Sequence, residues 1–222
     1  MIRIAHRGAS GYEFENSMSA FKKAIELGIK YIELDVRLTS DNQLVVFHDE
    51  RLDRCTNSVG NIRDLAYEEL HSNTLLSNGE KIPSLEDVCH LFKSHGVNVL
   101  IELKEDNIAF EVYEVVTGLL KSNTFIIGSF FHKQIFEIKN KHPALQTCIM
   151  FECYPINLTN YVNELKANFV AFGFETSSSL LVEEIKRANA KALVWTVNDL
   201  VDLEKAKKFN VDGIISNFPD RI

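Results

Sequence analysis

Four clusters of acidic, basic and imidazole side chains lie in or directly after short apolar runs of the sequence. They are His6-Arg7-Gly8, Glu33-Leu34-Asp35, His48-Asp49 and Glu102-Leu103-Lys104. If the apolar runs are parallel strands of a barrel, the side chains at their carboxyl ends build the active site. We therefore expect the four clusters to meet at one end of a barrel and to carry the chemistry.

The carboxyl groups of Glu33 and Asp35 are two residues apart, so on a strand both point to the same face. Their apolar neighbours point to the other face, which turns the two acids into the barrel. Buried carboxylates are costly unless they are paired or coordinated. With Glu102 they supply three oxygen ligands of the kind that Mg2+ or Ca2+ prefers. Alternatively, each acid forms a structural salt bridge, for which the candidate partners are Arg3, Arg37 and Lys104.

His6 and His48 lie at the ends of apolar runs, and neither follows the helical pattern that marks a core histidine. With an unperturbed pKa of about 6.5, one imidazole can accept a proton while the other donates one near neutral pH. Acid-base cleavage of a P–O bond requires such a pair of transfers. We expect surface or packing roles for the remaining histidines, which are His71, His90, His95, His132 and His142.

Three further side chains are candidates for contacts with a substrate. Arg7 offers a planar guanidinium that suits phosphate oxygens, and Lys104 offers a point charge on the same face as Glu102. Either cation could instead neutralise the carboxylates. Trp195, the only tryptophan, ends a predicted strand and is either an apolar wall for an alcohol group or part of the core.

Strand and helix patterns alternate along the chain, as they do in βα units around a parallel sheet. The predicted strands cover residues 2–6, 30–37, 97–103, 125–128, 145–150, 168–172, 191–196 and 213–216. The predicted helices cover residues 16–28, 84–95, 107–122, 132–141, 158–166, 178–189 and 199–209. This pattern predicts an α/β fold, a closed (β/α)8 TIM barrel formed by a single domain over residues 1–222.

Residues 43–83, after the second strand, break the alternation and are predicted to form a small insertion with an extra strand at 43–47. A loop of this size is unusual in a compact domain unless it has a function. In a barrel it would lie over the face where substrates bind.

Composition narrows the classes of function and the expected location. The net charge of −7 argues against a nucleic-acid partner or stable association with an anionic membrane. The chain has no apolar stretch of roughly 18 residues and no signal-peptide pattern at its start, so we expect a cytoplasmic protein. Its cysteines show no metal-binding spacing and are expected to be reduced thiols: Cys55, Cys89, Cys148 and Cys153.

In their order along the chain, these clusters resemble the glycerophosphodiester phosphodiesterase family. The matching segments are HRGASGY at 6–12, ENS at 15–17, IELDVRLTSD at 32–41, VVFHDERLDRCT at 45–56, IPSLEDV at 82–88, IELK at 101–104, VWTVND at 194–199 and DGIISNFPD at 212–220. Departures from the family pattern are found at Phe14, Ser17, Asn42 and Cys55, and none of them is a proposed catalytic group.

The resemblance implies hydrolysis of a glycerophosphodiester to glycerol 3-phosphate and an alcohol. It implies an acid-base pair (His6, His48), a divalent-cation site (Glu33, Asp35, Glu102), phosphate contacts (Arg7, Lys104) and bracing residues (Glu15, Asn16). One alternative is a lysophospholipase D-like or sphingomyelinase D-like enzyme with a lipid substrate. A second alternative is a catalytically inactive barrel that binds a phosphoester. The choice between Mg2+ and Ca2+, the roles of the two histidines, the alcohol and the oligomeric state stay open.

Overall fold

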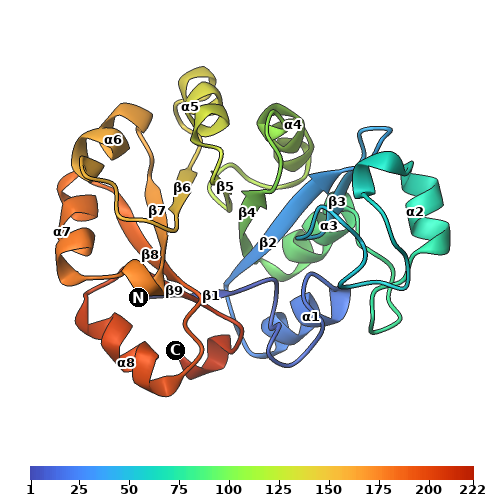
Figure 1. Ribbon diagram of the computed structural model, residues 1–222, viewed down its shortest axis with the longest axis horizontal. Coiled ribbons are helices and arrows are strands. Elements are labelled where there is room, and N and C mark those ends of the chain that lie inside the picture. The colour runs from blue at the N-terminus through green and yellow to red at the C-terminus, as the bar shows by residue number, and fades with distance from the viewer.

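A computed structural model describes residues 1–222, and its central feature is a closed barrel of parallel strands surrounded by helices (Figure 1). Closure follows from β1, which pairs with both β2 and β9. The barrel strands are β1 (Ile2–Ala5), β2 (Tyr31–Leu38), β4 (Asn98–Leu103), β5 (Phe125–Ser129), β6 (Thr147–Phe151), β7 (Phe169–Gly173), β8 (Lys191–Trp195) and β9 (Gly213–Ser216). The predicted TIM barrel is confirmed.

The helices cover the outside of the barrel, as crossover connections between parallel strands do. They are α1 (Met18–Glu26), α3 (Leu85–His95), α4 (Ala109–Leu119), α5 (His132–Lys141), α6 (Leu158–Leu165), α7 (Ser179–Arg187) and α8 (Leu200–Lys208). Local signals fix their ends. Ser84 accepts a hydrogen bond from the backbone N–H of Asp87 at the start of α3, and Gly96 ends this helix at a φ of 63°.

The second strand is longer than its neighbours and starts the insertion. The first two residues of β2 pair with β1, and its last three residues pair instead with the antiparallel strand β3 (Leu44–Val46). The short helices η1 (Ile62–Asp64) and α2 (Tyr67–Asn73) follow. Figure 1 shows α2 beside the barrel, next to β3. The insertion has its own apolar core, formed by Val45, Phe47, Leu52, Cys55, Ile62, Leu70, Leu76 and Ile82.

Two apolar layers position the strands. Inside the barrel, a small cluster that includes Leu100 and Met150 fills the space enclosed by the strands. A larger cluster, which includes Leu34 and Ile101, lies between the strands and the helices. Since Leu34 belongs to the outer layer, Glu33 and Asp35 on either side of it face the interior, as predicted.

Two simpler expectations concern thiols and membranes. All four cysteines are free thiols, which agrees with the prediction that they form no disulfide framework. None of the helices combines the length and the apolar character needed to cross a bilayer.

Candidate active site

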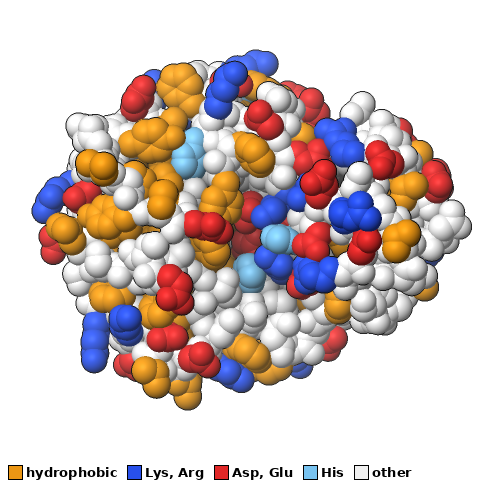
Figure 2. All heavy atoms as spheres, viewed as in Figure 1, with side chains coloured by type: hydrophobic (Ala, Val, Ile, Leu, Met, Phe, Trp, Pro, Cys, Tyr) orange, Lys and Arg blue, Asp and Glu red, His pale blue; other side chains and the backbone are white.

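The carboxyl ends of the strands surround a cavity of about 120 Å³. Figure 2 shows the hollow near the centre of this face, with cationic and histidine side chains gathered at one side and hydrophobic ones at the other. Its lining includes seven of the residues predicted from the sequence: His6, Arg7, Glu33, His48, Glu102, Lys104 and Trp195. Residues far apart in the chain are therefore brought to one place.

Three carboxylates lie together below the cavity. One oxygen from each of Glu33, Asp35 and Glu102 falls within 4.8 Å of the others, and these residues are at most 9% exposed. Glu33 Oε1 and Asp35 Oδ1 are buried without a hydrogen-bond partner. Burial and the neighbouring Asp35 charge raise the pKa of Glu33 well above its usual value and that of Glu102 to about 7. Partnerless buried oxygens around one point fit a divalent cation.

Two positively charged side chains, Lys104 and Arg7, contact these acids. Lys104 Nζ lies 2.6 Å from Glu102 Oε1 and 3.9 Å from Asp35 Oδ1. Arg7 Nε lies 3.2 Å from Asp35 Oδ2. Lys104 therefore forms the structural salt bridge that was the alternative explanation for these acids. Arg7 and Lys104 together carry two positive charges, one fewer than the negative charges of three ionised carboxylates. Arg37 does not pair with the three acids: it lies 3.7 Å from Glu105 and donates from Nε to the backbone oxygen of His48 at 2.8 Å.

His6, directly after β1, is oriented by an amide. Its Nδ1 lies 2.7 Å from Asn217 Oδ1, and Asn217 directly follows β9. With the amide oxygen as acceptor, Nδ1 carries the proton and Nε2 keeps its lone pair. Burial, followed by the positive charge of Arg7, lowers the pKa of His6 to about 4. His6 is therefore neutral in the metal-free protein at pH 7.

His48 is oriented by a carboxylate, which makes its environment different from that of His6. Its Nδ1 donates to Asp49 Oδ1 at 2.6 Å, which again leaves Nε2 free. Burial lowers the pKa of His48, and the Asp49 hydrogen bond and the Asp35 charge oppose this shift. Because an anionic partner stabilises an imidazolium, His48 has support for a positive charge that Asn217 does not give to His6.

The predicted bracing residues Glu15 and Asn16 belong to the β1–α1 loop and contact residues of the site. Glu15 accepts from Arg7 Nη1 at 2.9 Å, and the buried Asn16 donates to Asp35 Oδ2 at 2.8 Å. Arg7 itself has a φ of 55° and donates its backbone N–H to Glu33 Oε2 at 2.8 Å. A non-glycine residue in this region costs conformational energy, so the strain at Arg7 is maintained by its surroundings.

Sequence reasoning missed several residues that complete the site. Asn217 lies in the DGIISNFPD segment and Arg54 in the VVFHDERLDRCT segment, so both were present in recognised motifs without an assigned role. Asp49 was noticed beside His48 but was given no function. The opposite wall of the cavity, with Phe130, Met150 and Glu152, carries no motif. Trp195 stands on this wall, with its ring centroid 5.7 Å from that of Phe130.

The chain is similar over nearly its whole length to several known proteins. The Bacillus subtilis protein YhdW is 34% identical over 100% of this chain and 96% of its own length. The glycerophosphodiester phosphodiesterase of Caldanaerobacter subterraneus subsp. tengcongensis is 34% identical, over 99% of this chain and 95% of its own. An Oleispira antarctica phosphodiesterase, solved in complex with the product sn-glycerol-3-phosphate, superposes with a TM-score of 0.93 at 26% identity and covers 100% of this chain and 95% of its own.

A family model described as the glycerophosphoryl diester phosphodiesterase family matches residues 6–221, which includes every residue of the site described above. With nearly the whole chain matched, the chain belongs to the glycerophosphoryl diester phosphodiesterase family.

Proposed function

We propose that this protein hydrolyses glycerophosphodiesters to sn-glycerol 3-phosphate and an alcohol, with a divalent cation and two histidines. The observation that carries the proposal is one cavity that joins two imidazoles to three clustered carboxylates. Membership of the family and the product bound to the Oleispira antarctica relative support the same substrate class.

Glu33, Asp35 and Glu102 would hold Mg2+ or Ca2+, and the buried oxygens Glu33 Oε1 and Asp35 Oδ1, which lack hydrogen-bond partners, support this. When bound, such a cation neutralises phosphate charge and polarises the P–O bonds. The acidic cluster otherwise repels a phosphodiester, so the cation explains how an acidic protein accepts an anionic substrate.

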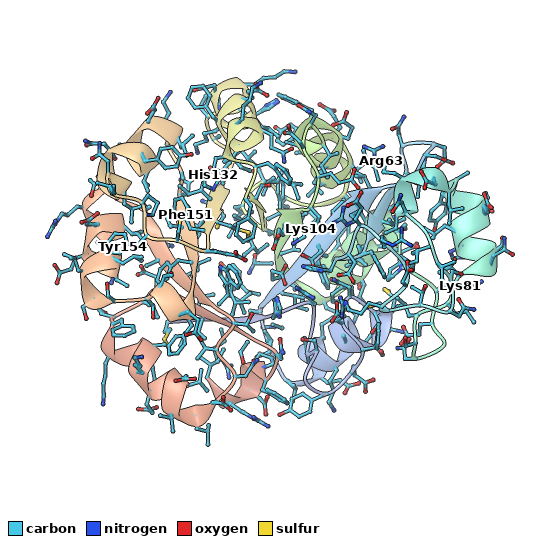
Figure 3. All side chains as sticks on the ribbon, viewed as in Figure 1. Arg63, Lys81, Lys104, His132, Phe151 and Tyr154 are labelled. Atoms are coloured by element: carbon cyan, nitrogen blue, oxygen red, sulfur yellow. The ribbon has the colours of Figure 1, made fainter.

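Two cationic side chains are proposed to orient the phosphate. Lys104 directly follows β4, on the side of the barrel where Figure 3 labels it, and it lines the cavity. Arg7 Nε is buried without a hydrogen bond, although it lies 3.2 Å from Asp35. Both groups are donors without acceptor capacity, which suits contact with phosphate oxygens in addition to the carboxylates.

The two histidines are proposed to move the protons, because each has Nδ1 engaged and Nε2 available. One imidazole takes the proton of the glycerol hydroxyl next to the phosphate, and that oxygen forms a bond to phosphorus. The other imidazole protonates the departing alcohol as its P–O bond breaks. Water then opens the cyclic phosphodiester to glycerol 3-phosphate, with the proton transfers reversed.

The apolar wall is proposed to pack against the carbon skeleton of the substrate. Trp195 and Phe130 stand edge to face on this side of the cavity. Phe130, which lines the cavity, is 36% exposed, and the next residue along the chain, Phe131, is 44% exposed. A lysophospholipid, whose acyl chain would extend over this surface, is therefore the second substrate class to test.

The test is a panel of glycerophosphodiesters with different alcohols and one lysophospholipid, with release of sn-glycerol 3-phosphate or of the free alcohol as readout. We expect turnover of the glycerophosphodiesters. Turnover of the lysophospholipid alone would favour the lipid alternative. Binding of glycerol 3-phosphate without turnover of any diester would favour a catalytically inactive, phosphoester-binding barrel.

A further inference from the structure

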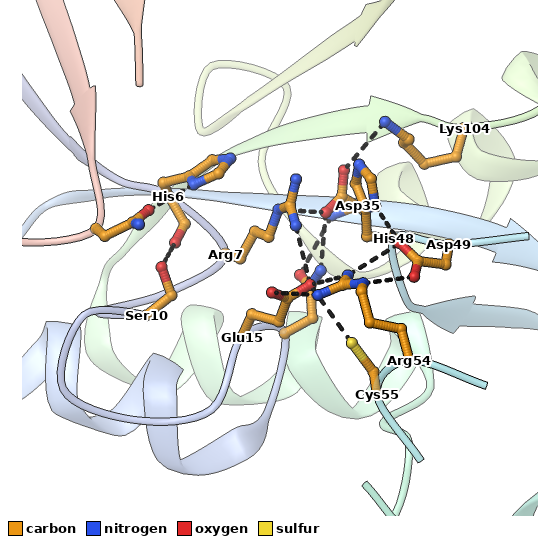
Figure 4. A network of polar contacts seen from close by, with 12 residues as sticks. His6, Arg7, Ser10, Glu15, Asp35, His48, Asp49, Arg54, Cys55 and Lys104 are labelled. Carbon is orange, nitrogen blue, oxygen red and sulfur yellow. Dashed lines mark hydrogen bonds and ion pairs between the residues drawn. The ribbon is translucent and has the colours of Figure 1, made fainter. Parts of the chain in front are cut away.

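An arginine of the insertion contacts two acids that belong to different parts of the site. Arg54 donates from Nε to Asp49 Oδ2 at 2.6 Å and from Nη2 to Asp49 Oδ1 at 2.9 Å. The same guanidinium donates from Nη2 to Glu15 Oε1 at 2.7 Å and from Nη1 to Glu15 Oε2 at 3.2 Å. Figure 4 shows Arg54 between these two carboxylates.

Each acid has a second partner that lines the cavity. Asp49 accepts from His48 Nδ1, and Glu15 accepts from Arg7 Nη1 at 2.9 Å. The chain of contacts therefore runs from His48 through Asp49, Arg54 and Glu15 to Arg7 (Figure 4). Arg54 is the one member that touches both acids, and it does not line the cavity itself.

We propose that Arg54 is a positioning residue, which sets the orientation of His48 through Asp49 and of Arg7 through Glu15. The inference rests on the proposed function of His48 and Arg7. It extends that function to the insertion, because Arg54 connects the insertion to Glu15 on the β1–α1 loop, 39 residues away.

Geometry explains why this position needs an arginine. A guanidinium holds five N–H donors in one plane and can engage two carboxylates along two edges. A lysine offers one nitrogen, which cannot reproduce four directed hydrogen bonds. The Asp49 carboxylate illustrates the strength of the contact, since the hydrogen bonds from Arg54 are the main cause of its strongly lowered pKa. Without Arg54, the rotation of Asp49 is restrained on the His48 side alone.

A matched control lies three residues earlier. Arg51 is also exposed and also pairs with an acid, Asp53, at 3.0 Å, but neither residue contacts the site. The exposed fractions of the two arginine side chains are similar, at 58% for Arg51 and 51% for Arg54. Arg51→Ala therefore removes the same type of surface ion pair from the same segment without removing the link between Asp49 and Glu15.

The experiment measures kcat and KM of the full chain for Arg54→Ala, Arg54→Lys and Arg51→Ala, with melting temperature as the control for folding. We expect kcat/KM of both Arg54 variants to fall about 10- to 100-fold, the usual effect of removing a residue that orients a side chain of the site. Arg51→Ala should stay within about twofold of the parent. Arg54→Ala should also regain activity when guanidinium is added at millimolar concentrations. Arg54 variants as active as Arg51→Ala would overturn the proposal.

Double-mutant cycles separate positioning from general stability. If Arg54 acts through both acids, then Arg54→Ala should cost less in an Asp49→Asn background or in a Glu15→Gln background than in the parent, because each background has already lost one of the two links. Losses that multiply in both cycles would contradict the proposal.

A spectroscopic readout does not depend on turnover. The downfield proton resonance of the His48 Nδ1–H, identified by its loss in His48→Ala, should move or vanish in Arg54→Ala and persist in Arg51→Ala. An unchanged resonance in folded Arg54→Ala would refute positioning of His48 even in a protein that proved inactive. Absence of turnover in the parent enzyme, by contrast, would refute the proposed function and leave the resonance test intact.

Discussion

Asp35 and Glu102 are direct partners across the neighbouring strands β2 and β4, and both side chains belong to the buried acidic cluster. Adjacent parallel strands lie about 4.8 Å apart, so this register fixes two carboxylates at the spacing of ligands to one ion. Glu33, two residues before Asp35 on the same face of β2, completes the cluster. The register of the barrel strands therefore brings these carboxylates together.

The acidic cluster should destabilise the metal-free protein as the pH rises. The pKa of Glu102 is raised to about 7 in the folded state, so the folded protein binds this proton more tightly than the unfolded chain. Its contribution to stability is therefore lost as the pH rises from about 4.5 to about 7. In EDTA, Glu102→Gln should melt at a higher temperature than the parent at pH 7.5, by a few degrees, and this gap should shrink at pH 4.5.

The control for this prediction is the divalent cation. Added Mg2+ or Ca2+ should raise the melting temperature of the parent more than that of Glu102→Gln, because the variant has lost an anionic ligand. Equal melting temperatures of the two proteins in EDTA at both pH values would argue against the raised pKa.

Removal of either imidazole should abolish most of the turnover while the cation site survives. His6→Ala and His48→Ala are each expected to lose about 10²- to 10⁴-fold in kcat, the usual contribution of a general acid or base. Cation binding, measured by calorimetry, should stay near that of the parent because neither histidine belongs to the acidic cluster. Near-normal kcat in one of the two variants would exclude that histidine from the chemistry.

Loss of the Asn217 amide, which orients His6, should lower the turnover rate more than the stability of the protein. Asn217→Ala removes the acceptor at 2.7 Å from Nδ1, so the ring can rotate and change its tautomer. We expect kcat to fall about 10- to 100-fold, with a change of melting temperature of only a few degrees. A large loss of stability with unchanged kcat in the remaining folded enzyme would assign Asn217 a structural role instead.

A glycine next to the site provides a test of the local backbone. Gly8 has a φ of 81°, and an added Cβ would lie 2.7 Å from the backbone carbon of Ala20. Gly8→Ala should therefore destabilise the protein by about 1–3 kcal/mol and lower activity, because the shift displaces Arg7. Gly118→Ala, in α4 with open space around it, should instead stabilise by about 0.5–1 kcal/mol. Chemical denaturation of both variants checks the pair.

Much of the fold and the chemical core of the site could be predicted from the sequence. Periodicity located the strands and helices because each has one face against an apolar layer, and the spacing of Glu33 and Asp35 fixed their common direction. Trp195 lines the cavity. From the sequence it could equally be an apolar wall of the site or part of the core, because a tryptophan at the end of a strand fits both positions.

The partners of His6 and of Glu15 could not be predicted, because they come from distant segments. Asn217 lies 211 residues from His6, and they meet only because β9 and β1 are neighbours that close the barrel. Arg54 reaches Glu15 only through the path of the insertion, which has no periodic signal. The left-handed backbone conformation of Arg7 could not be predicted from the sequence either, because arginine is not a residue type that favours this conformation.

The most direct test of the cation-dependent hydrolysis is the rate of sn-glycerol 3-phosphate release by the parent protein and by Asp35→Asn. Each is measured in EDTA and after addition of excess Mg2+ or Ca2+. We predict that EDTA abolishes release by the parent, that at least one of the two ions restores it, and that Asp35→Asn stays nearly inactive under both conditions. Undiminished release by the parent in EDTA, together with an active Asp35→Asn, would contradict it.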